Sequence, residues 1–359
     1  MKVLLNTSPL ADGNKDRGIG MYTRQLLASL RDFSPQNQSL IVQATHEVIE
    51  KIVSPELDFD LIHYPFFDFF FATLPTNHKL PFIVTIHDVI PLLYPKQYPA
   101  GIKGTIKLLR QKWAVQKATA IITDSQASKD GITEKLSIPS NKVFVVPLAG
   151  NPEISELSDS QARRLESSLS LPKKYIVYVG DINYNKNLPA LLLALTQLPS
   201  DLHLCVVSRT FHNKSIPEGQ RLASIIREND LEDRVHVLDI PHDSPKLLSA
   251  VMHESVAVIQ PSLWEGFGLP VLEAFQAGAL VVSSNAGSLP EVYGEAAIAI
   301  EPTIIGLVTG VENALKLRGE EREKLIQLGR QQAKKFSWEK TAQLTCQVYE
   351  EILSREGQA

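Results

Sequence analysis

Short apolar segments alternate with amphipathic stretches along the whole chain. Their length and their Val, Ile and Leu content predict strands at residues 3–6, 39–43, 61–63, 82–86, 120–123 and 143–146, and again at residues 175–179, 203–207, 235–238, 256–260, 280–283 and 297–300. Near-continuous apolar strands are typical of parallel sheets that helices cover on both faces. The pattern therefore predicts an α/β protein of two Rossmann-like, doubly wound domains facing a cleft, with ligands at the carboxyl ends of strands.

A polar stretch at residues 151–170 separates the two halves and has room for a linker and a short helix. The chain has 359 residues, which is too long for one ordinary core and suits two domains. Residues 337–353 have the pattern of one amphipathic helix. We expect a first domain at residues 1–165, a second at residues 166–335 and a C-terminal helical segment at residues 336–359.

Composition and charge narrow the classes of function. Apolar residues make up 44% of the chain and charged residues 21%, as is usual for globular proteins. A net charge of -4 argues against a general nucleic-acid binder, which would carry a basic stripe. Cys205 and Cys346 lie far apart, so we expect reduced, buried thiols. With no signal-peptide pattern and no apolar run that could span a bilayer, we expect a cytoplasmic protein.

The segment from Pro261 to Glu273 carries the most informative pattern. A predicted strand leads into it, and a helix is expected to begin at Pro270, because proline lacks the N–H that would have no partner at the first helical position. Gly278 supplies a signal for the helix to end. Glu265 then lies in a loop and Glu273 in the first turn of the helix.

The loop between these two glutamates suits a ligand. Gly266 and Gly268 let backbone N–H groups approach a ligand without a Cβ in the way. A helix N-terminus adds free amides and a positive dipole end, which favour phosphate. The alternative is that Glu273 complements the helix dipole and Glu265 is a solvated loop residue. The combination favours a site for a ligand with phosphate and hydroxyl groups.

The corresponding turn of the second half runs from Gly180 to Asn187. It joins a strand to a helix expected at residues 188–198, with Asn187 as the N-cap. Lys186 would lie beside the helix N-terminus, where an ammonium group and free amides together can neutralise a diphosphate. The alternative is an ordinary surface lysine.

In the first half, His87 follows the strand at residues 82–86. A histidine at a strand end can donate a hydrogen bond to a hydroxyl or accept a proton near neutral pH. The alternative is a histidine that satisfies local backbone groups, with Asp88 as a cap or turn residue.

Gly18, Ile19 and Gly20 precede an amphipathic helix, well after the first strand. A nicotinamide enzyme would show G-x-G-x-x-G immediately after that strand, so the spacing argues against dinucleotide binding. The glycines instead suit a loop that lets a sugar or phosphate come close, with a flexible turn as the alternative. The chain also lacks metal-ligand spacing of Cys and His, a G-x-S-x-G elbow and a P-loop, so we expect no metal, hydrolase or nucleoside triphosphatase site.

An aromatic cluster follows the third predicted strand and comprises Phe66, Phe67, Phe69, Phe70 and Phe71. Such a cluster can line an acceptor groove or touch a membrane surface. Packing of a loop against helices is favoured, because aromatic groups usually fill cores.

Together these features resemble the retaining glycosyltransferases of family 4, which have the two-domain GT-B fold. The similarity runs over nearly the whole chain, through residues 18–20, 87–88, 123–128, 180–187, 265–273, 287–292 and 336–338. It implies that the helix at residues 336–359 crosses back to pack on the first domain. The two glutamates with Gly-Phe-Gly-Leu-Pro between them are among the more specific motifs of that family.

The resemblance implies a nucleotide-sugar donor as co-substrate and no further cofactor. Glu273 would hold the ribose hydroxyls, and Glu265 would lie at the transferred sugar. Lys186 would balance the charge of the leaving phosphate, and His87 would contact the donor sugar near the reacting carbon.

The remaining donor-site residues are assigned by the same resemblance. The donor site would also include Gly18, Gly20, Gly180, Asn187, Gly266, Phe267, Gly268 and Leu269. Many members of the family carry an arginine soon after the glycine that corresponds to Gly180, and this chain does not. Arg209, after the next strand, is the candidate to replace it.

The implied reaction moves a hexose, with mannose the first choice, from GDP-mannose or a UDP-sugar to a glycan, polysaccharide or lipid-linked acceptor. Three alternatives stay open: a nucleotide-sugar epimerase of GT-B architecture, an inverting transferase with Asp88 or His87 as base, and a two-lobed binding module. A peripheral contact with the inner face of the membrane is a further expectation, and the sequence does not indicate an oligomeric state.

Overall fold

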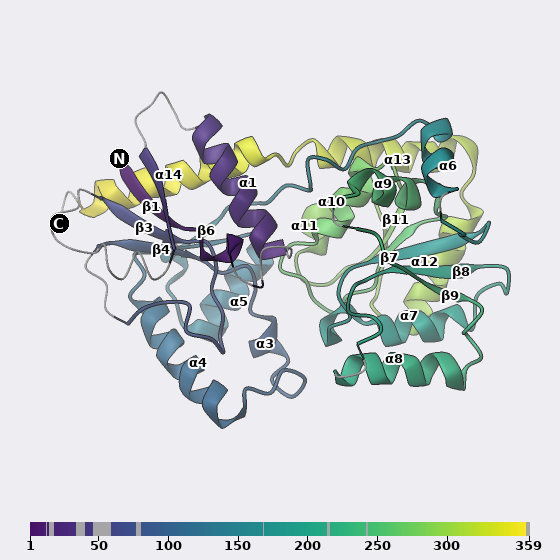
Figure 1. Ribbon diagram of the computed structural model, residues 1–359, viewed down its shortest axis with the longest axis horizontal. Coiled ribbons are helices and arrows are strands. Elements are labelled where there is room, and N and C mark those ends of the chain that lie inside the picture. Colours follow the sequence, from purple (N-terminus) through teal and green to yellow (C-terminus); the bar gives the residue numbers. More distant parts are fainter. Residues whose placement is uncertain are drawn as a thin grey trace. The chain divides into compact units, whose positions relative to one another are not determined.

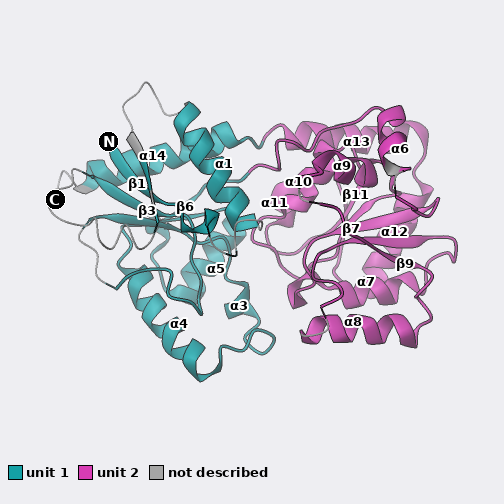
Figure 2. Ribbon diagram, viewed as in Figure 1, with its two compact units in different colours: residues 1–148, 336–359 teal, residues 149–335 magenta. Residues whose placement is uncertain are grey.

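The computed structural model describes residues 1–11, 13, 18–33, 40–45, 59–76, 80–167, 169–213, 216–241 and 243–356. These residues form two compact units (Figure 2). Unit 1 comprises residues 1–148 and 336–359, and unit 2 comprises residues 149–335. Each unit contains a six-stranded sheet whose paired strands are all parallel. The prediction of two doubly wound, parallel-sheet domains is confirmed.

In unit 1 the strand order is β2-β1-β3-β4-β5-β6. The strands are β1 Lys2–Asn6, β2 Leu40–Ala44, β3 Leu61–Tyr64, β4 Phe82–Thr85, β5 Ala120–Thr123 and β6 Val143–Val145. The helices are α1 Gly18–Phe33, α3 Ile90–Leu93, α4 Gly101–Gln116, α5 Gln126–Leu136 and α14 Trp338–Glu356, with short 3₁₀ turns η1 Ser8–Leu10 and η3 Ser140–Lys142. Helices α1 and α14 contact each other on one face of the sheet, and α4 and α5 cover the other (Figure 1).

In unit 2 the strand order is β12-β11-β10-β7-β8-β9. The strands are β7 Tyr175–Val179, β8 His203–Val207, β9 Val235–Leu238, β10 Val258–Gln260, β11 Val281–Ser284 and β12 Ile298–Ile300. The helices are α6 Asp159–Glu166, α7 Leu188–Leu195, α8 Pro217–Glu228, α9 Pro245–Glu254, α10 Leu269–Gln276, α11 Leu289–Tyr293, α12 Ile304–Lys316 and α13 Gly319–Ala333, with the 3₁₀ turn η4 Tyr184–Lys186.

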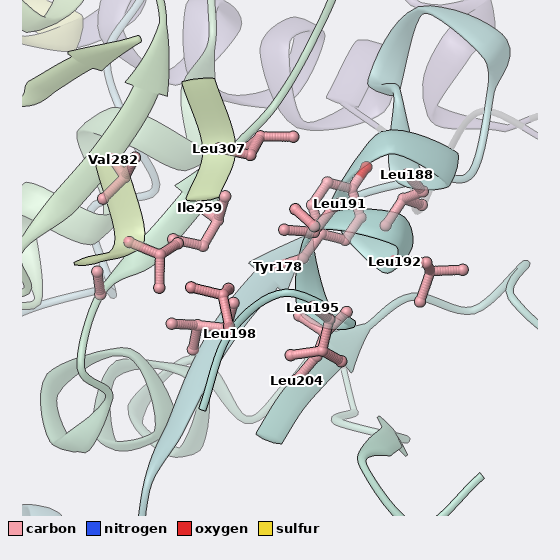
Figure 3. Close-up of a cluster of buried hydrophobic side chains, with 14 of the residues drawn as sticks. Tyr178, Leu188, Leu191, Leu192, Leu195, Leu198, Leu204, Ile259, Val282 and Leu307 are labelled. Atoms are coloured by element: carbon pink, nitrogen blue, oxygen red, sulfur yellow. The ribbon is translucent and has the colours of Figure 1, made fainter. Parts of the chain in front are cut away.

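The core of unit 2 shows why the apolar runs form these elements. Every residue of β10 and β11 is buried, as expected for strands covered on both faces. Helix α7 fills one face with leucines, and Leu188, Leu191 and Leu192 pack beside Tyr178 of β7 (Figure 3). The cluster also contains Leu195, Leu198, Leu204, Ile259, Val282 and Leu307.

Several element boundaries differ from the expected ones. Helix α10 begins at Leu269 and not at Pro270, which takes its second position. Glu273 therefore lies beyond the first turn of the helix, although it was expected within that turn. Gly18 and Gly20 are not in a loop, because they form the first turn of α1. Helix α7 ends at Leu195 and not at residue 198.

The division of the chain also differs from the expected boundary at residue 165. Unit 2 begins at Ala149. Leu157, just before α6, and Ala162 of α6 cluster with Ala250 of α9, so the polar stretch belongs to that unit. The C-terminal helix α14 belongs to unit 1, where it contacts α1.

Other expectations can be compared with the described residues. Cys205 and Cys346 are free and buried. In the aromatic cluster, Phe67 and Phe69 are buried, which supports packing, whereas Phe71 is 64% exposed. Among the helices that the structure describes, none has the length and apolar character needed to cross a membrane.

The leucine core of unit 2 gives a stability prediction. Leu191→Ala should lower the free energy of unfolding by about 2–5 kcal/mol, because Leu191 is fully buried and its truncation leaves a cavity there. Leu193→Ala in the same helix is the matched control, since Leu193 is only partly buried. Urea unfolding followed by circular dichroism measures both. Equal losses in the two variants would contradict the packing described for α7.

Candidate functional site

The central strands of unit 2 create a position where ligands bind in open α/β sheets. Strands β7 and β10 are neighbours, and the strand order reverses between them. The loops that leave these two strands at their carboxyl ends therefore meet at one point. One loop carries Lys186 and the other carries Glu265.

Glu265 and Lys186 form an ion pair at this point. The Lys186 Nζ lies 2.8 Å from Glu265 Oε1 and 2.9 Å from Oε2. Both side chains are largely buried, with exposed fractions of 18% for Lys186 and 7% for Glu265. A buried ion pair needs additional hydrogen bonds to offset the loss of hydration.

Two neighbouring side chains supply those hydrogen bonds. Ser262 Oγ donates to Glu265 Oε1 at 2.6 Å, and Gln260 Nε2 donates to the same oxygen at 2.8 Å. Oε1 thus accepts three hydrogen bonds, whereas Oε2 accepts one, from Lys186. Oε2 is consequently the oxygen with remaining capacity for a ligand hydroxyl.

The loop after β7 is shaped by Asn187 and Tyr178. Asn187 lies at the N-terminus of α7, as predicted, but its backbone is left-handed and its side chain does not cap the helix. Its Nδ2 donates instead to the carbonyls of Pro261 and Pro302, at 3.0 and 2.9 Å. The Tyr178 hydroxyl donates to the carbonyl of Asp181. Asn187 therefore joins the two loops instead of capping the helix.

The loop after β10 is held from several sides. Asn185 accepts from the N–H of Leu263 at its carbonyl and donates from its side chain to the Trp264 carbonyl. Ser288 Oγ donates to the carbonyls of Glu265 and Phe267, at 3.0 and 2.8 Å. These bonds fix the path of the backbone that presents Glu265.

Two glycines are required by this close packing. A Cβ on Gly287 would lie 2.8 Å from backbone atoms of Glu265. Gly268 has a φ of 107°, and a Cβ there would lie 2.6 Å from the Leu289 side chain. Larger residues would displace the loop at both positions.

The N-terminus of α10 presents backbone groups suited to an anion. Gly268 is the N-cap residue and provides no side chain to cap the helix. Within the described residues, no group accepts a hydrogen bond from the N–H of Leu269, the first helical residue. The helix dipole adds partial positive charge at this end. Gly266 and the buried Phe267 belong to the same loop.

Glu273 is a partly buried carboxyl in α10 with an altered proton affinity. Burial raises the pKa of Glu273 to about 7, against an ordinary value of 4.5. A hydrogen bond from the backbone N–H of Asn151 lowers this pKa but does not cancel the effect of burial. The side chain therefore changes its charge near neutral pH.

Arg209 belongs to a neighbouring loop of unit 2. Arg209 is exposed in the loop after β8. The next residue, Thr210, donates to Asp181 Oδ1 at 3.4 Å, so the loops after β7 and β8 touch. Gly180 lies at the start of the β7 loop with a φ of 148°.

Unit 1 contains a separate polar centre at His87. His87 Nδ1 lies 2.8 Å from Asp124 Oδ2, and the Asp124 side chain is 3% exposed. Burial lowers the pKa of His87, but the charge and hydrogen bond of Asp124, with smaller contributions from Asp88 and the Pro65 carbonyl, raise it above the ordinary value overall. Nε2 is buried and has no well-formed hydrogen bond among the described residues. Asp88 accepts from the N–H of Ile90, as a turn residue does.

The first turns of α1 contact the same centre. The Tyr22 ring lies edge-on to the His87 ring, with 4.7 Å between centroids. Tyr22, Thr85, His63 and Tyr349 then form a buried chain of hydrogen bonds that reaches α14. Gly18 and Gly20 thus belong to the element that packs on His87.

The structure therefore brings the predicted residues together in two groups. Unit 2 assembles Lys186, Glu265 and the N-terminus of α10, and unit 1 assembles His87 and the start of α1. Sequence reasoning assigned no role to Gln260, Ser262 and Asp124, which supply the partners of the central charges. Only their positions at strand ends could have indicated them. The described residues include no cluster of His, Cys, Asp or Glu suited to a metal ion.

Comparison with known proteins identifies the family. The family model "Glycosyl transferases group 1" matches residues 160–332, and the model "Glycosyltransferase Family 4" matches residues 18–153. The chain belongs to these glycosyltransferases. The two matches together cover most of both units and include the loops that carry His87, Lys186 and Glu265.

Curated relatives of this glycosyltransferase include mannosyltransferases. The serotype-specific mannosyltransferase WbdA of Escherichia coli is 26% identical over 345 residues, which are 94% of this chain and 42% of WbdA. The O-antigen chain mannosyltransferase B of Escherichia coli is 27% identical over 277 residues, which are 74% of this chain and 69% of that protein. The chain thus spans less than half the length of WbdA.

Solved structures support the fold of this glycosyltransferase. A sucrose-phosphate synthase from Thermosynechococcus elongatus aligns with a TM-score of 0.75 at 19% identity, covering 99% of each chain. HepE from Anabaena, solved with UDP and glucose, aligns with a TM-score of 0.73 at 17% identity, covering 97% of this chain and 99% of HepE. The two units are those of the GT-B fold.

The buried ion pair gives a prediction about stability. Lys186→Met should lower the free energy of unfolding of this glycosyltransferase by about 3–5 kcal/mol, because it leaves Glu265 buried without its countercharge. The double variant Lys186→Met/Glu265→Gln should lose less than the sum of the single losses. Denaturant unfolding of the wild type and the three variants measures the coupling.

The matched control is the pair of Lys174 and Asp201, whose Nζ and Oδ2 atoms lie 2.9 Å apart with exposed fractions of 35% and 66%. Solvent screens this pair, so Lys174→Met and Asp201→Asn should show little coupling. Similar coupling in both cycles would contradict the buried character of the pair at Glu265.

Proposed function

We propose that this chain is a retaining glycosyltransferase that moves a hexose from a nucleoside-diphosphate sugar to a hydroxyl of a glycan, polysaccharide or glycolipid. The observation that carries the proposal is the ion pair of Lys186 and Glu265 beside the N-terminus of α10, at the switch point of the second sheet. This arrangement offers a cation and amides for phosphate together with a carboxylate for hydroxyls.

The hydrogen-bonding groups that remain available suggest which residue binds which part of the nucleotide sugar. An ammonium group has three N–H bonds, and two of those of Lys186 go to Glu265, which leaves one for a phosphate oxygen. Glu265 Oε2 can accept from a hydroxyl of the transferred sugar. In this proposal Glu273, farther along α10, holds the ribose hydroxyls.

The backbone supplies the other contacts of the proposed donor site. The amides at Gly266, Phe267, Gly268 and Leu269 line the loop and helix start that would receive the diphosphate and the sugar. Gly180 allows the β7 loop to pass close to the donor, and Asn187 holds the two loops together. Arg209 is proposed as a further cation for the phosphates.

Transfer requires cleavage of the bond between the anomeric carbon and the diphosphate through an oxocarbenium-like state. The catalytic requirement is therefore stabilisation of charge on the departing phosphate, which Lys186 and the α10 amides can provide without a metal ion. For retention we propose that the acceptor hydroxyl attacks on the side that the phosphate leaves. The leaving phosphate takes the proton of the hydroxyl.

His87 is proposed to donate a hydrogen bond to the donor sugar. Asp124 orients the imidazole by holding Nδ1, so that Nε2 is the ring nitrogen left to donate to a ligand. Gly18 and Gly20, in the helix that packs on His87, are proposed to face the donor phosphate or the acceptor.

The similarity to mannosyltransferases favours GDP-mannose as the donor, and UDP-sugars come second because HepE was solved with UDP and glucose. The mannosyltransferase relatives also favour a glycan as the acceptor, including one carried on a lipid. Transfer to an acceptor distinguishes this proposal from a binding module.

A donor screen with activity measurements tests the function. A productive nucleotide sugar should raise the melting temperature of the purified protein by mass action. With that donor and an acceptor, Glu265→Ala and Lys186→Ala should lower transfer at least about 100-fold, because each removes charge from the reacting centre. Lys174→Ala, at a partly exposed lysine of the same unit, is the control and should transfer normally.

Two outcomes would overturn the proposal. One is the lack of any nucleotide sugar that raises the melting temperature. The other is full transfer by folded Glu265→Ala and Lys186→Ala. Nuclear magnetic resonance of the product determines whether the anomeric configuration is retained.

The pKa of Glu273 predicts how donor affinity depends on pH. Because burial raises this pKa from 4.5 to about 7, stability contributed by the neutral carboxyl is present below pH 4.5 and is lost as the pH rises through 7. Ribose hydroxyls donate best to the ionised form. Donor affinity should therefore rise by up to about tenfold per pH unit below 7 and level off above it.

Calorimetry of nucleotide-sugar binding between pH 5.5 and 8.5, roughly one to two units on either side of the pKa, measures this dependence. Glu273→Gln should bind weakly with a flat profile and should gain stability over the wild type as the pH rises through 7. Glu295→Gln, at an exposed position of the same unit, should keep the wild-type profile. A flat profile in the wild type would exclude Glu273 from the ribose site.

A further inference from the structure

Helix α4 exposes a stripe of large apolar side chains. Ile102, Ile106, Leu109 and Trp113 have exposed fractions of 84%, 56%, 63% and 50%. At 100° per residue these positions fall within about 60° of one another around the helix. The stripe is therefore a continuous apolar surface along the length of α4.

The opposite side of α4 already packs on unit 1. Gln111, Ala114 and Val115 are buried there, on the face of the sheet away from α1 and α14 (Figure 1). The Gln111 side chain accepts from the N–H groups of Thr73 and Leu74 and donates to the Leu74 carbonyl. A surface helix normally directs polar residues away from such a core, so the exposed apolar stripe needs a separate explanation.

Cations surround the stripe. Helix α4 contains no Asp or Glu, and it contains or adjoins Lys103, Lys107, Arg110, Lys112 and Lys117. None of these five forms an ion pair with a carboxylate of the described residues. This local excess of positive charge contrasts with the net charge of -4 of the whole chain.

Two aromatic rings combine the apolar and the cationic parts of this surface. Lys117 Nζ lies 3.4 Å from the centroid of the Trp113 ring. Lys107 Nζ lies 5.2 Å from the ring of Phe71, which is itself 64% exposed and extends the apolar surface beyond α4. Aromatic rings with neighbouring cations suit the boundary between lipid tails and headgroups.

We propose that α4, together with Phe71, docks on the surface of an anionic lipid bilayer. The apolar stripe enters the boundary between headgroups and acyl chains, and the flanking cations contact lipid phosphates. A second copy of this chain fits the surface less well, because its own α4 would place its lysines and arginine against the lysines and arginine of the first copy. Nucleic acid is also poorer, since apolar side chains and not cations occupy the centre of the exposed face.

This inference goes beyond the proposed transfer reaction and does not depend on which donor is used. Docking in this orientation would hold unit 1 at the membrane without any spanning segment. For an acceptor carried on a lipid, it would restrict the search for the acceptor to the membrane plane.

Vesicle co-sedimentation of the full chain tests the proposal. The wild type should bind vesicles of phosphatidylcholine mixed with phosphatidylglycerol, and bind phosphatidylcholine alone much more weakly. Ile102→Ser/Leu109→Ser should lower binding at least about tenfold, because two large apolar side chains no longer enter the bilayer. Ile305→Ser in unit 2 is the matched control, since Ile305 is 76% exposed, and it should bind like the wild type.

A second pair of variants tests the charge. Lys103→Glu/Lys107→Glu should lose binding to anionic vesicles, whereas Lys324→Glu/Lys334→Glu, the same charge change at exposed positions of unit 2, should retain most of it. Trp113 fluorescence should shift to the blue on binding, and Trp113→Phe should abolish the shift.

The proposal is overturned if the wild type binds neither vesicle or if Ile102→Ser/Leu109→Ser binds normally. Self-association through the stripe would overturn it as well. In that case the wild type would be a dimer in solution, Ile102→Ser/Leu109→Ser would be a monomer, and neither protein would bind vesicles. Melting temperatures and their rise with donor confirm folding of each variant. Since vesicle binding requires no donor, its failure would leave the proposed function intact.

Discussion

The ion pair of Lys186 and Glu265 is the interaction on which the site of unit 2 depends. It joins the loops that leave the neighbouring strands β7 and β10, and it lies away from solvent. Burial makes two charges costly unless donors and acceptors replace the lost water, and Gln260 and Ser262 do this at Oε1. The ion pair sets the spacing of the two loops. Asn187 and Ser288 add hydrogen bonds to backbone carbonyls of the loop after β10.

The same ion pair leaves specific hydrogen-bonding groups available for a ligand. One oxygen of Glu265 is saturated and the other is not, and one N–H of Lys186 stays available. The N-terminus of α10 adds a further donor without a charge of its own. A site built in this way can receive an anion and a hydroxyl with little rearrangement, which is the condition for electrostatic catalysis by preorganised groups.

Unit 1 shows a different use of polar groups. His87 and Asp124 are paired in the interior, and a hydrogen-bonded chain from Tyr22 through His63 reaches Tyr349 of α14. The residues at the carboxyl end of the first sheet are thereby tied to the last helix of the chain. On the other face of that sheet, α4 places the buried Gln111 side chain toward the core and an apolar stripe toward solvent. One helix therefore stabilises the fold and also exposes an apolar surface.

Much of the fold follows from the sequence alone, because periodicity and turn residues act over short distances. Apolar runs predicted every strand of the described residues, and the motif around Glu265 and Glu273 indicated the loop after β10, where Glu265 pairs with Lys186. Tertiary structure decided which partners these residues have. Lys186 and Glu265 are 79 positions apart, and His87 and Asp124 are 37 apart, so only the order of strands brings them together. Likewise, α4 has apolar positions on two sides, and only packing on the sheet determines which side stays exposed.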